Sequence, residues 1–383
     1  MLHLLRKWPR AMLAGLVVGL GAAGALPGVA AAAPRHHAGY VYVDDNTAGV
    51  NTIAGFRQRV DGTLVPLPGS PFSAGGAGTG SGLASQGAIQ VSSDRHYVLA
   101  VDARSNEISV LRIRRHGGLR LVDVASSGGV TPVSLTEHDG LVYVANAGAG
   151  GSSYAGFTLS PDGQLSPLAG SRFALPDSAQ PGDVLFNSTG THLAGSRVGT
   201  SQIDSFRVSR DGRLIPAPGS PFAAQGAGPF GSEFRPTHPT QLFVSNAHDG
   251  PGKGTVSAWG VAHDGTLTPI GSSPFADLQT APCWVEISHD GRFLFTVNTA
   301  ADTISRYAIS PGGSLTLLGS TPVVGGSGTG SVDARLSRDG RTLYVNESRI
   351  RALGEFAVSG GQLAPLGAAA LPSGAAAAGL AVK

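Results

Sequence analysis

Apolar and polar residues alternate along most of this sequence in short runs that are separated by polar turns. In residues 281–318 the runs APCWVEIS, FLFTVN, TISRYAIS and LTLL are separated by HDGR, TAAD and PGGS. Alternation over about five residues with Asp-Gly at the reversals is typical of β-hairpins, because Gly readily adopts the positive φ that tight turns need. We therefore expect units of four antiparallel strands, here named A to D in chain order.

The turn between strands C and D recurs through the sequence. DGTLVPLPGSPF (61–72) returns as DGRLIPAPGSPF (211–222), and looser copies of the turn occur elsewhere. The copies begin at Asp61, His116, Asp162, Asp211, Asp264, Gly312 and Gly360. Seven four-stranded units spaced by about fifty residues predict an all-β fold, a seven-bladed β-propeller. A β-sandwich would not repeat in this register, and β-helix coils are shorter.

The two ends of the chain predict how the ring closes. The first unit begins with strand B (Tyr40–Asp45) and has no strand A before it. The C-terminal residues 375–383 (AAAAGLAVK) have no unit of their own. We expect this tail to supply the missing strand A, so that one blade combines N- and C-terminal strands.

The first residues have the pattern of a secretory signal peptide. Arg6, Lys7 and Arg10 precede an apolar run at 11–26, and the small-residue stretch GVAAAAP (28–34) follows Pro27. This order predicts a signal peptide at 1–33 and one propeller domain at 34–383. The protein would then be secreted or periplasmic, without a membrane span after cleavage. Retention of the segment as an anchor is the alternative.

Charge and cysteine content limit the possible partners. The chain has 27 basic and 25 acidic residues, and 27 − 3 = 24 basic residues remain without the signal. This near neutrality offers no basic field for nucleic acid. Cys283 is the only cysteine, so no internal disulfide can form, and we expect a small buried side chain. We expect a monomer.

The lengths of the connections distinguish the two faces of the ring. The short A–B and C–D turns share one face, here called the turn face, and the longer B–C and D–A connections share the other, the loop face. Long loops on a rigid scaffold are common places for binding residues, so we expect the site on the loop face. Most histidines fall in A–B or C–D turns; among those after the first strand, only His248, in the B–C loop 246–254, should reach the loop face.

Two sets of polar residues could line the loop-face mouth. The polar ends of the B strands form a ring: Asp45, Asp102, Asn146, Arg197, Asn246, Asn298 and Glu347. An inner set lies in or before strand A: Gln86, Asp183, Glu233, Arg235, Trp284, Glu286, Asp333 and Arg335. Turn capping is the simpler explanation for single Asn and Asp residues. The ring could still bind an anion through Arg104, Arg197 and Arg335, or a cation through its oxygens.

The sequence offers little support for a cofactor or metal. It contains no G-x-S-x-G, no P-loop and no zinc-ligand spacing. Calcium would suit the oxygen ligands, but no D-x-D-x-D spacing occurs. We therefore expect no cofactor and no metal, and a central divalent cation remains the alternative.

The repeated S-x-DGR-x-LYVxN unit, followed by ISxYxIxxxGxL, resembles the lactonase-family β-propellers. This family includes 6-phosphogluconolactonase-like and carboxymuconate-cyclase-like proteins and the related YVTN repeats. The similarity extends from about Tyr40 to the end of the chain and is closest at 131–148 and 279–298. These two stretches resemble the exported branch of the family.

The resemblance implies a carboxylic-ester or lactone hydrolase, or a lactonizing cyclase. It also implies a His, Arg and Glu cluster, with the His in an HPHG-type strand A. The corresponding segments here are GAIQVSSD and QPGDVLFN, and only Glu233 and Arg235 in SEFRP match the acidic–arginine pattern.

Two functions remain open from the sequence. The first is lactone hydrolysis, with Glu233 or His248 as base and Arg197, Arg235 or Arg335 holding the carboxylate and oxyanion. The second is a non-catalytic propeller that binds a sugar, an anionic ligand or a surface partner. The candidate binding residues are Asp102, Arg104, Asn146, Asp183, Asn246, Trp284, Glu286, Asn298, Asp333 and Glu347.

Overall fold

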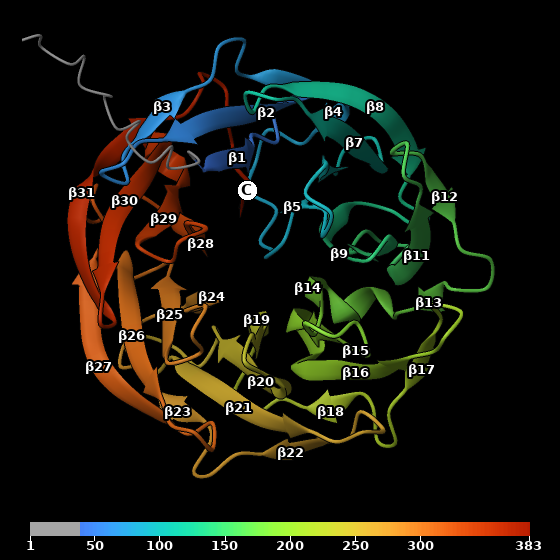
Figure 1. Ribbon diagram of the computed structural model, residues 1–383. Helices are drawn as coiled ribbons and strands as arrows, with labels where there is room; N and C mark the ends of the chain where they lie inside the picture. Colours follow the sequence, from blue (N-terminus) through green and yellow to red (C-terminus); the bar gives the residue numbers. More distant parts are fainter. Residues whose placement is uncertain (1–38) are drawn as a thin grey trace, which may run out of the picture. The chain divides into compact units, whose positions relative to one another are not determined.

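Seven β-sheets form a ring around a central channel in the computed structural model, which describes residues 39–383 (Figure 1). The predicted signal peptide at 1–33 lies outside the described residues. Each sheet is a blade of antiparallel strands, ordered from an inner strand A to an outer strand D. The prediction of an all-β seven-bladed propeller is confirmed.

The blades follow one another in chain order. Blade 1 contains β32 (Gly379–Val382), β1 (Tyr40–Asp44), β2 (Gly49–Gln58), β3 (Leu64–Pro66) and β4 (Phe72–Gly78). Blade 2 contains β5 (Ile89–Val91), β6 (Tyr97–Asp102), β7 (Glu107–Ile113) and β8 (Leu119–Ser126). Blade 3 contains β9 (Pro132–His138), β10 (Leu141–Asn146), β11 (Ser153–Leu159), β12 (Leu165–Pro167) and β13 (Phe173–Ala174).

The remaining blades have the same plan. Blade 4 contains β14 (Pro181–Phe186), β15 (His192–Arg197), β16 (Gln202–Val208), β17 (Leu214–Pro216) and β18 (Phe222–Ala223). Blade 5 contains β19 (Pro229–Arg235), β20 (His238–Asn246), β21 (Thr255–Val261), β22 (Leu267–Pro269) and β23 (Phe275–Ala276). Blade 6 contains β24 (Pro282–Ile287), β25 (Phe293–Asn298), β26 (Thr303–Ile309) and β27 (Leu315–Pro322). Blade 7 contains β28 (Ser331–Leu336), β29 (Thr342–Glu347), β30 (Ala352–Ser359) and β31 (Gln362–Ala370).

Three short 3₁₀ helices lie in the connections: η1 (Asp177–Ala179), η2 (Val198–Thr200) and η3 (Ser348–Ile350). Between residues 39 and 383, no helix is long and apolar enough to cross a membrane.

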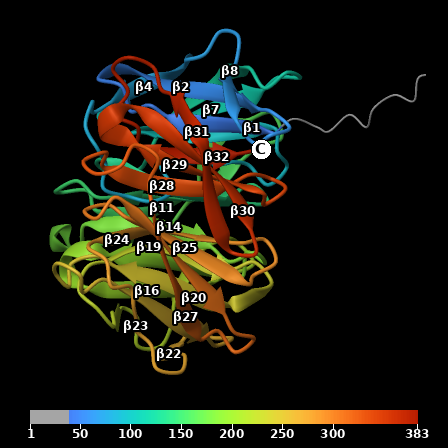
Figure 2. The same cartoon turned by 90° about the vertical axis from the view of Figure 1, so that its left-hand side faces the viewer.

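The C-terminal strand closes the ring, as predicted from the two ends of the chain. β32 pairs antiparallel with β1, with Val41 opposite Val382 and Asp44 opposite Gly379. The side view in Figure 2 shows the C-terminal strands next to the N-terminal ones. Because neither end can form a complete blade alone, closure joins the two ends of the chain in one sheet.

The repeated GSPF stretch interrupts the outer strand of a blade. In blades 1, 3, 4 and 5 the outer strand consists of two short pieces separated by a turn. The turn serine replaces the missing strand partner: Ser220 Oγ accepts a hydrogen bond from Ser205 N at 3.1 Å, and Ser273 Oγ accepts one from Ala258 N at 2.7 Å. The serine is needed because a buried backbone N–H without an acceptor is costly.

The core lies between neighbouring blades. One cluster joins Leu99 and Val101 of blade 2 to Leu135 and Val142 of blade 3, and all four are fully buried. The phenylalanine of each GSPF-type stretch contributes to such interfaces: Phe173 of blade 3 packs edge-on against Phe206 of blade 4, with ring centroids 5.0 Å apart. Each blade therefore depends on its neighbours for burial of its apolar faces.

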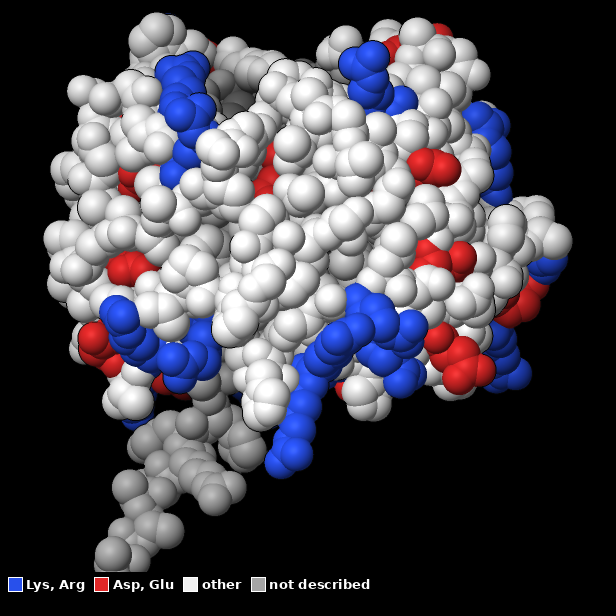
Figure 3. All heavy atoms as spheres, turned by 90° about the horizontal axis from the view of Figure 1, so that it is seen from above, with Lys and Arg blue, Asp and Glu red and all other residues white. Residues whose placement is uncertain are grey.

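Charged side chains are sparse on the side of the ring that Figure 3 shows. The rim in Figure 3 is mostly uncharged, with basic and acidic side chains scattered across it. This distribution is consistent with a charged fraction of 14%.

We predict that removing residues 374–383 abolishes cooperative folding at 37 °C. The deletion exposes the edge of β1 and removes Leu380, whose burial alone contributes about 1.5–3 kcal/mol. Thermal unfolding followed by circular dichroism checks this, with Lys383→Ala as a control because its backbone bonds to Tyr40 remain. A truncated protein with unchanged melting would contradict closure by β32.

Candidate functional site in the central channel

The inner strands line the channel and carry its polar groups. In blades 3 to 7, strand A has a register shift close to its first residue, for example between Pro181 and Asp183 in β14 and between Pro282 and Trp284 in β24. Such bulges change the direction in which the following side chains point. They bring acidic residues of β14, β19, β24 and β28 to the interfaces between inner strands.

Side chains of one inner strand accept backbone N–H groups of the next. The inner strand is an edge strand, so every second N–H faces the channel without a strand partner. Glu233 Oε2 accepts from Ile287 N at 2.6 Å, and Asp183 Oδ2 accepts from Ser232 N at 2.9 Å. Acceptors occur at six of the seven junctions: Gln90, Ser134 with Thr136, Asp183, Glu233, Glu286 and Asp333.

A cavity of about 430 Å³ occupies the channel. Among the sequence-predicted residues, Gln86, Asp183, Glu233, Glu286 and Arg335 line it. The remaining lining includes residues of the A–B turns, namely His138, Asn187, Ser188, Pro236 and His289. The cavity therefore reaches the turn face, and its lining gives no support to the expectation of a site on the loop face.

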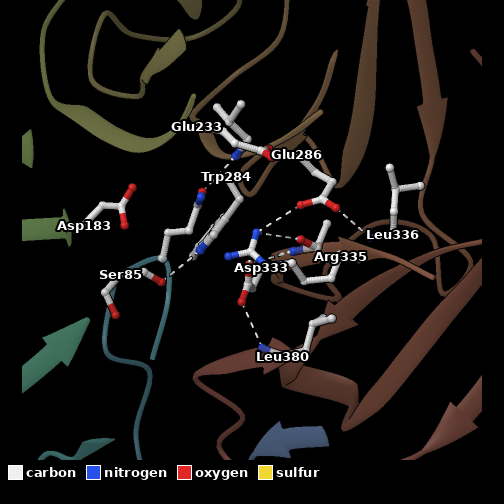
Figure 4. Close-up of polar contacts among 12 residues, drawn as sticks. Ser85, Asp183, Glu233, Trp284, Glu286, Asp333, Arg335, Leu336 and Leu380 are labelled. Carbon is white, nitrogen blue, oxygen red and sulfur yellow. Dashed lines mark hydrogen bonds and ion pairs between the residues drawn. The ribbon is translucent and has the colours of Figure 1, made fainter. Parts of the chain in front are cut away.

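Among the described residues, Arg335 is the only Lys or Arg that lines the cavity. It lies near four carboxyl groups of the inner strands, here called the channel carboxyls: Asp183, Glu233, Glu286 and Asp333 (Figure 4). Its Nη1 lies 3.2 Å from Glu286 Oε2 and 3.7 Å from Asp333 Oδ1. Its Nε and Nη2 form no hydrogen bond with any described residue, and the side chain is 20% exposed. Part of the guanidinium is therefore available to a ligand in the cavity.

Burial controls the protonation of the channel carboxyls. Burial raises the pKa of Asp183 to about 7, although hydrogen bonds from Ser232 partly oppose this rise. Burial likewise raises the pKa of Glu286 to about 7, although the charge of Arg335 lowers it. Burial and the neighbouring Glu286 raise the pKa of Glu233 well above its usual value. We therefore expect these carboxyl groups to keep their protons to higher pH than exposed carboxyls do.

Glu233 differs from the other three carboxyl groups in having a free oxygen. Glu286 and Asp333 each use both oxygens in contacts with backbone N–H groups or Arg335. Asp183 accepts from Ser232 through one oxygen and from Ser134 through the other. The Oε1 of Glu233 has no partner among the described residues, and the half-buried side chain lines the cavity. Glu233 can therefore exchange a proton with a bound molecule.

Two predicted arginines lie away from the cavity. Arg197 pairs with both oxygens of Asp204, each at 2.6 Å, inside blade 4. Arg235 donates to Gly291 O at 2.7 Å and to Gln241 Oε1 at 2.9 Å, so it links the turns of blades 5 and 6. Neither guanidinium lines the cavity with Glu233. His248 is exposed in the B–C loop of blade 5, outside the cavity.

The predicted ring at the B-strand ends is buried. Asp102, Asn146, Asn246, Asn298 and Glu347 are each 0% exposed. Their side chains bond locally; for example, Asn246 Nδ2 donates to Ser257 Oγ at 2.8 Å, and Glu347 accepts from the backbone of Val324 and Gly325. These local hydrogen bonds are what turn capping, the simpler explanation for the Asn and Asp residues of the ring, would produce. Arg104 is exposed beside this ring.

Metal-binding geometry is lacking in the part of the chain that the structure describes, where no group of three or more His, Cys, Asp or Glu residues could hold an ion. Cys283 is buried as a free thiol, and burial raises its pKa to about 11.

Sequence reasoning missed two contributions to the cavity. His138 and His289 line it, although their position in turns suggested solvent-exposed residues. Gln86 was expected in the inner polar set at the loop-face mouth, but its bonds across the channel to blades 4, 5 and 6 were not foreseen. The isolated Gln among small residues in SGLASQG (81–87) was the available signal.

Comparison with known proteins supports the fold and the family resemblance. Residues 235–338 match the family model "Lactonase, 7-bladed beta-propeller", a segment that contains Glu286, Asp333 and Arg335. The predicted resemblance to lactonase-family propellers is thereby confirmed, and the resemblance to the exported branch stays a prediction. No curated protein sequence matches the chain.

Solved structures of similar fold cover nearly the whole propeller. A proposed 6-phosphogluconolactonase from Bacteroides uniformis superposes with a TM-score of 0.71 at 20% identity, covering 90% of this chain and 99% of that one. The corresponding protein from Bacteroides fragilis gives 0.70 at 20%, covering 92% and 99%. The periplasmic gluconolactonase PpgL of Pseudomonas aeruginosa gives 0.68 at 18%, covering 90% and 99%. At these identities the likeness demonstrates the fold.

We predict that stability falls as pH rises from about 5 to 8. Carboxyl groups whose pKa is raised by folding bind protons more tightly in the folded state, so their ionisation destabilises it. Asp183→Asn should reduce this fall by an amount on the order of a few kcal/mol, because the amide can still accept from Ser232 and donate to Ser134.

Urea unfolding at pH 5, 6, 7 and 8 measures this effect. Asp61→Asn is the control, because hydrogen bonds from Thr63 lower the pKa of that exposed turn residue. An unchanged pH slope in the Asp183 variant would argue against a buried proton at this position.

Proposed function

We propose that this protein is a lactonase-like hydrolase that opens a small lactone in the channel cavity. The supporting observation is that one cavity is lined both by Glu233, which has an oxygen without a hydrogen bond, and by Arg335, whose guanidinium is only partly engaged. The match to the lactonase family and the fold of the gluconolactonase-type proteins favour this chemistry.

The two side chains have complementary roles in this proposal. Glu233 in its ionised form takes a proton from water as the water oxygen attacks the lactone carbonyl. The free N–H groups of Arg335 stabilise the negative charge on the carbonyl oxygen. When the ring C–O bond breaks, Glu233 returns the proton to the leaving oxygen. The new carboxylic acid then loses its own proton to solvent, and Arg335 holds the resulting carboxylate. In this scheme Glu233 activates the water, so no step is assigned to a cofactor.

Export of the protein is part of the proposal. The basic, apolar and small-residue order of residues 1–33 supports a secreted or periplasmic location. The structural similarity to a periplasmic gluconolactonase is consistent with this location. A secreted enzyme would act on lactones outside the cytoplasm, as a monomer in the simplest case.

We expect Glu233→Gln to lower kcat by about 10²–10⁴-fold on any lactone that the wild type hydrolyses, because the amide cannot accept the proton. Arg335→Lys should also lower kcat, since lysine keeps the charge but loses the planar fork. His248→Ala serves as the control and should leave the rate unchanged, because this residue lies outside the cavity.

A panel of sugar and aliphatic lactones, corrected for spontaneous hydrolysis, provides the measurement. The wild-type kcat should rise with pH, because burial raises the pKa of Glu233 and only the ionised form acts as a base. A full rate in Glu233→Gln, or loss of activity in His248→Ala alone, would exclude this assignment.

A non-catalytic binding function is the second candidate. The observation favouring it is that three of the four channel carboxyls have both oxygens engaged, and each of the three makes at least one contact with a neighbouring blade. In that case Arg335 would hold a sugar acid without turnover. Calorimetric binding of an aldonic acid that is lost in Arg335→Ala, without hydrolysis of any lactone in the panel, would support this function.

A further inference from the structure

A short segment of the connection between β4 and β5 crosses the channel. We call residues Ala84–Gly87 the strap; Figure 1 shows this connection entering the centre of the ring ahead of β5. Gln86 N donates to Gly182 O of blade 4 at 2.9 Å, and Gly87 O accepts from Leu135 N of blade 3 at 2.8 Å. The strap connects blades 1 and 2 along the chain, and its backbone is therefore also attached to blades 3 and 4.

The Gln86 side chain extends these attachments across the channel. Its Nε2 donates to Ser232 O at 2.8 Å, and its Oε1 accepts from Val285 N at 3.0 Å. One amide thus joins the inner strands of blades 5 and 6, and the residue is only 3% exposed. Gly231 leaves space for it, since a Cβ there would clash with Gln86 Oε1.

Ser85 makes the remaining contacts. Its carbonyl oxygen accepts from Trp284 Nε1 of blade 6 at 2.9 Å, as drawn in Figure 4, and its Oγ donates to Val133 O of blade 3 at 2.7 Å. Trp284 is 4% exposed and packs edge-on against Phe230. Ala84 has a φ of +52°, a conformation that non-glycine residues rarely adopt. The strap therefore has a single, well-defined path.

We propose that the strap makes the channel a blind cavity that ligands enter only from the turn face, with Gln86 as its floor and a specificity-determining residue. The strap bonds lie on one side of the cavity, and the A–B turn residues His138 and His289 lie in its lining on the other. A chain-like ligand cannot pass through such a channel.

The cavity volume indicates the size of the ligand. About 430 Å³ is near the lower end of the usual range for small-molecule sites. The strap therefore selects single small molecules, of about one or two sugar rings, over oligomers. The identification of that ligand as a lactone rests on the proposed function, whereas the direction of access does not.

The test measures access with a thiol reagent and needs no turnover. Leu185 lines the cavity and is half-buried, so Leu185→Cys in a Cys283→Ala background provides a reporter inside it. The probe is a small methanethiosulfonate reagent, and the readout is the labelling rate by mass spectrometry. His138→Trp together with His289→Trp narrows the turn-face mouth. Asp264→Trp, in an exposed turn of the same face, is the matched control.

We expect the paired tryptophans to slow labelling at least about tenfold and the control to leave it unchanged. Adding Gln86→Ala should restore rapid labelling, because the reagent then reaches the cavity from the loop face. Replacement of Ser85 and Gln86 by two glycines is a second way of opening the strap, and circular dichroism checks the fold of each variant.

Two results would overturn the proposal: labelling insensitive to the paired tryptophans, or a blocked cavity that neither strap variant reopens. If labelling follows the expectation but no lactone is hydrolysed, the blind cavity stands and the hydrolase assignment fails. An opened strap should also admit larger lactones if both proposals hold, which would appear as a lower KM for these substrates in Gln86→Ala.

Discussion

The structure depends on how the inner edges of the blades satisfy their backbone N–H groups. A propeller places seven edge strands around one channel, and each presents donors that no neighbouring strand can pair. Here the acceptors are side chains of the adjacent inner strand, and at four junctions they are carboxylates. Hydrogen bonding thus holds the blades together and gathers acidic groups in the channel.

The same arrangement determines the acid–base properties of the site. Burial raises the pKa values of these four carboxyls, and repulsion between neighbouring carboxyls adds to the effect for Asp183, Glu233 and Glu286. The charge of Arg335 offsets part of it. Most of these groups are occupied by their structural role. Glu233 is the exception, because it holds Ile287 N with one oxygen and leaves the other free. Its position allows one residue to serve both the interface and the proposed reaction.

The strap adds a constraint that the repeat alone does not contain. A perfect repeat would make the connections between successive blades equivalent. The connection between β4 and β5 differs from this, because its residues Ser85 and Gln86 reach across the axis and bond to blades 3, 4, 5 and 6. These hydrogen bonds link blades across the ring, and the strap that they hold in place blocks the channel in our proposal. The regular scaffold thus acquires its asymmetry from a few residues in a glycine-rich loop.

The sequence by itself determined the number of blades, their strand order and closure by the C-terminal tail, because strand alternation and turn chemistry are local and repeat along the chain. It also included Asp183, Glu233, Glu286 and Arg335 among the candidate residues. Only the tertiary structure separated these from Arg197 and Arg235, since the direction of a long side chain depends on partners such as Asp204 and Gly291 in space. The closed side of the channel was likewise decided by contacts between residues as distant as Gln86 and Val285, which no local pattern encodes.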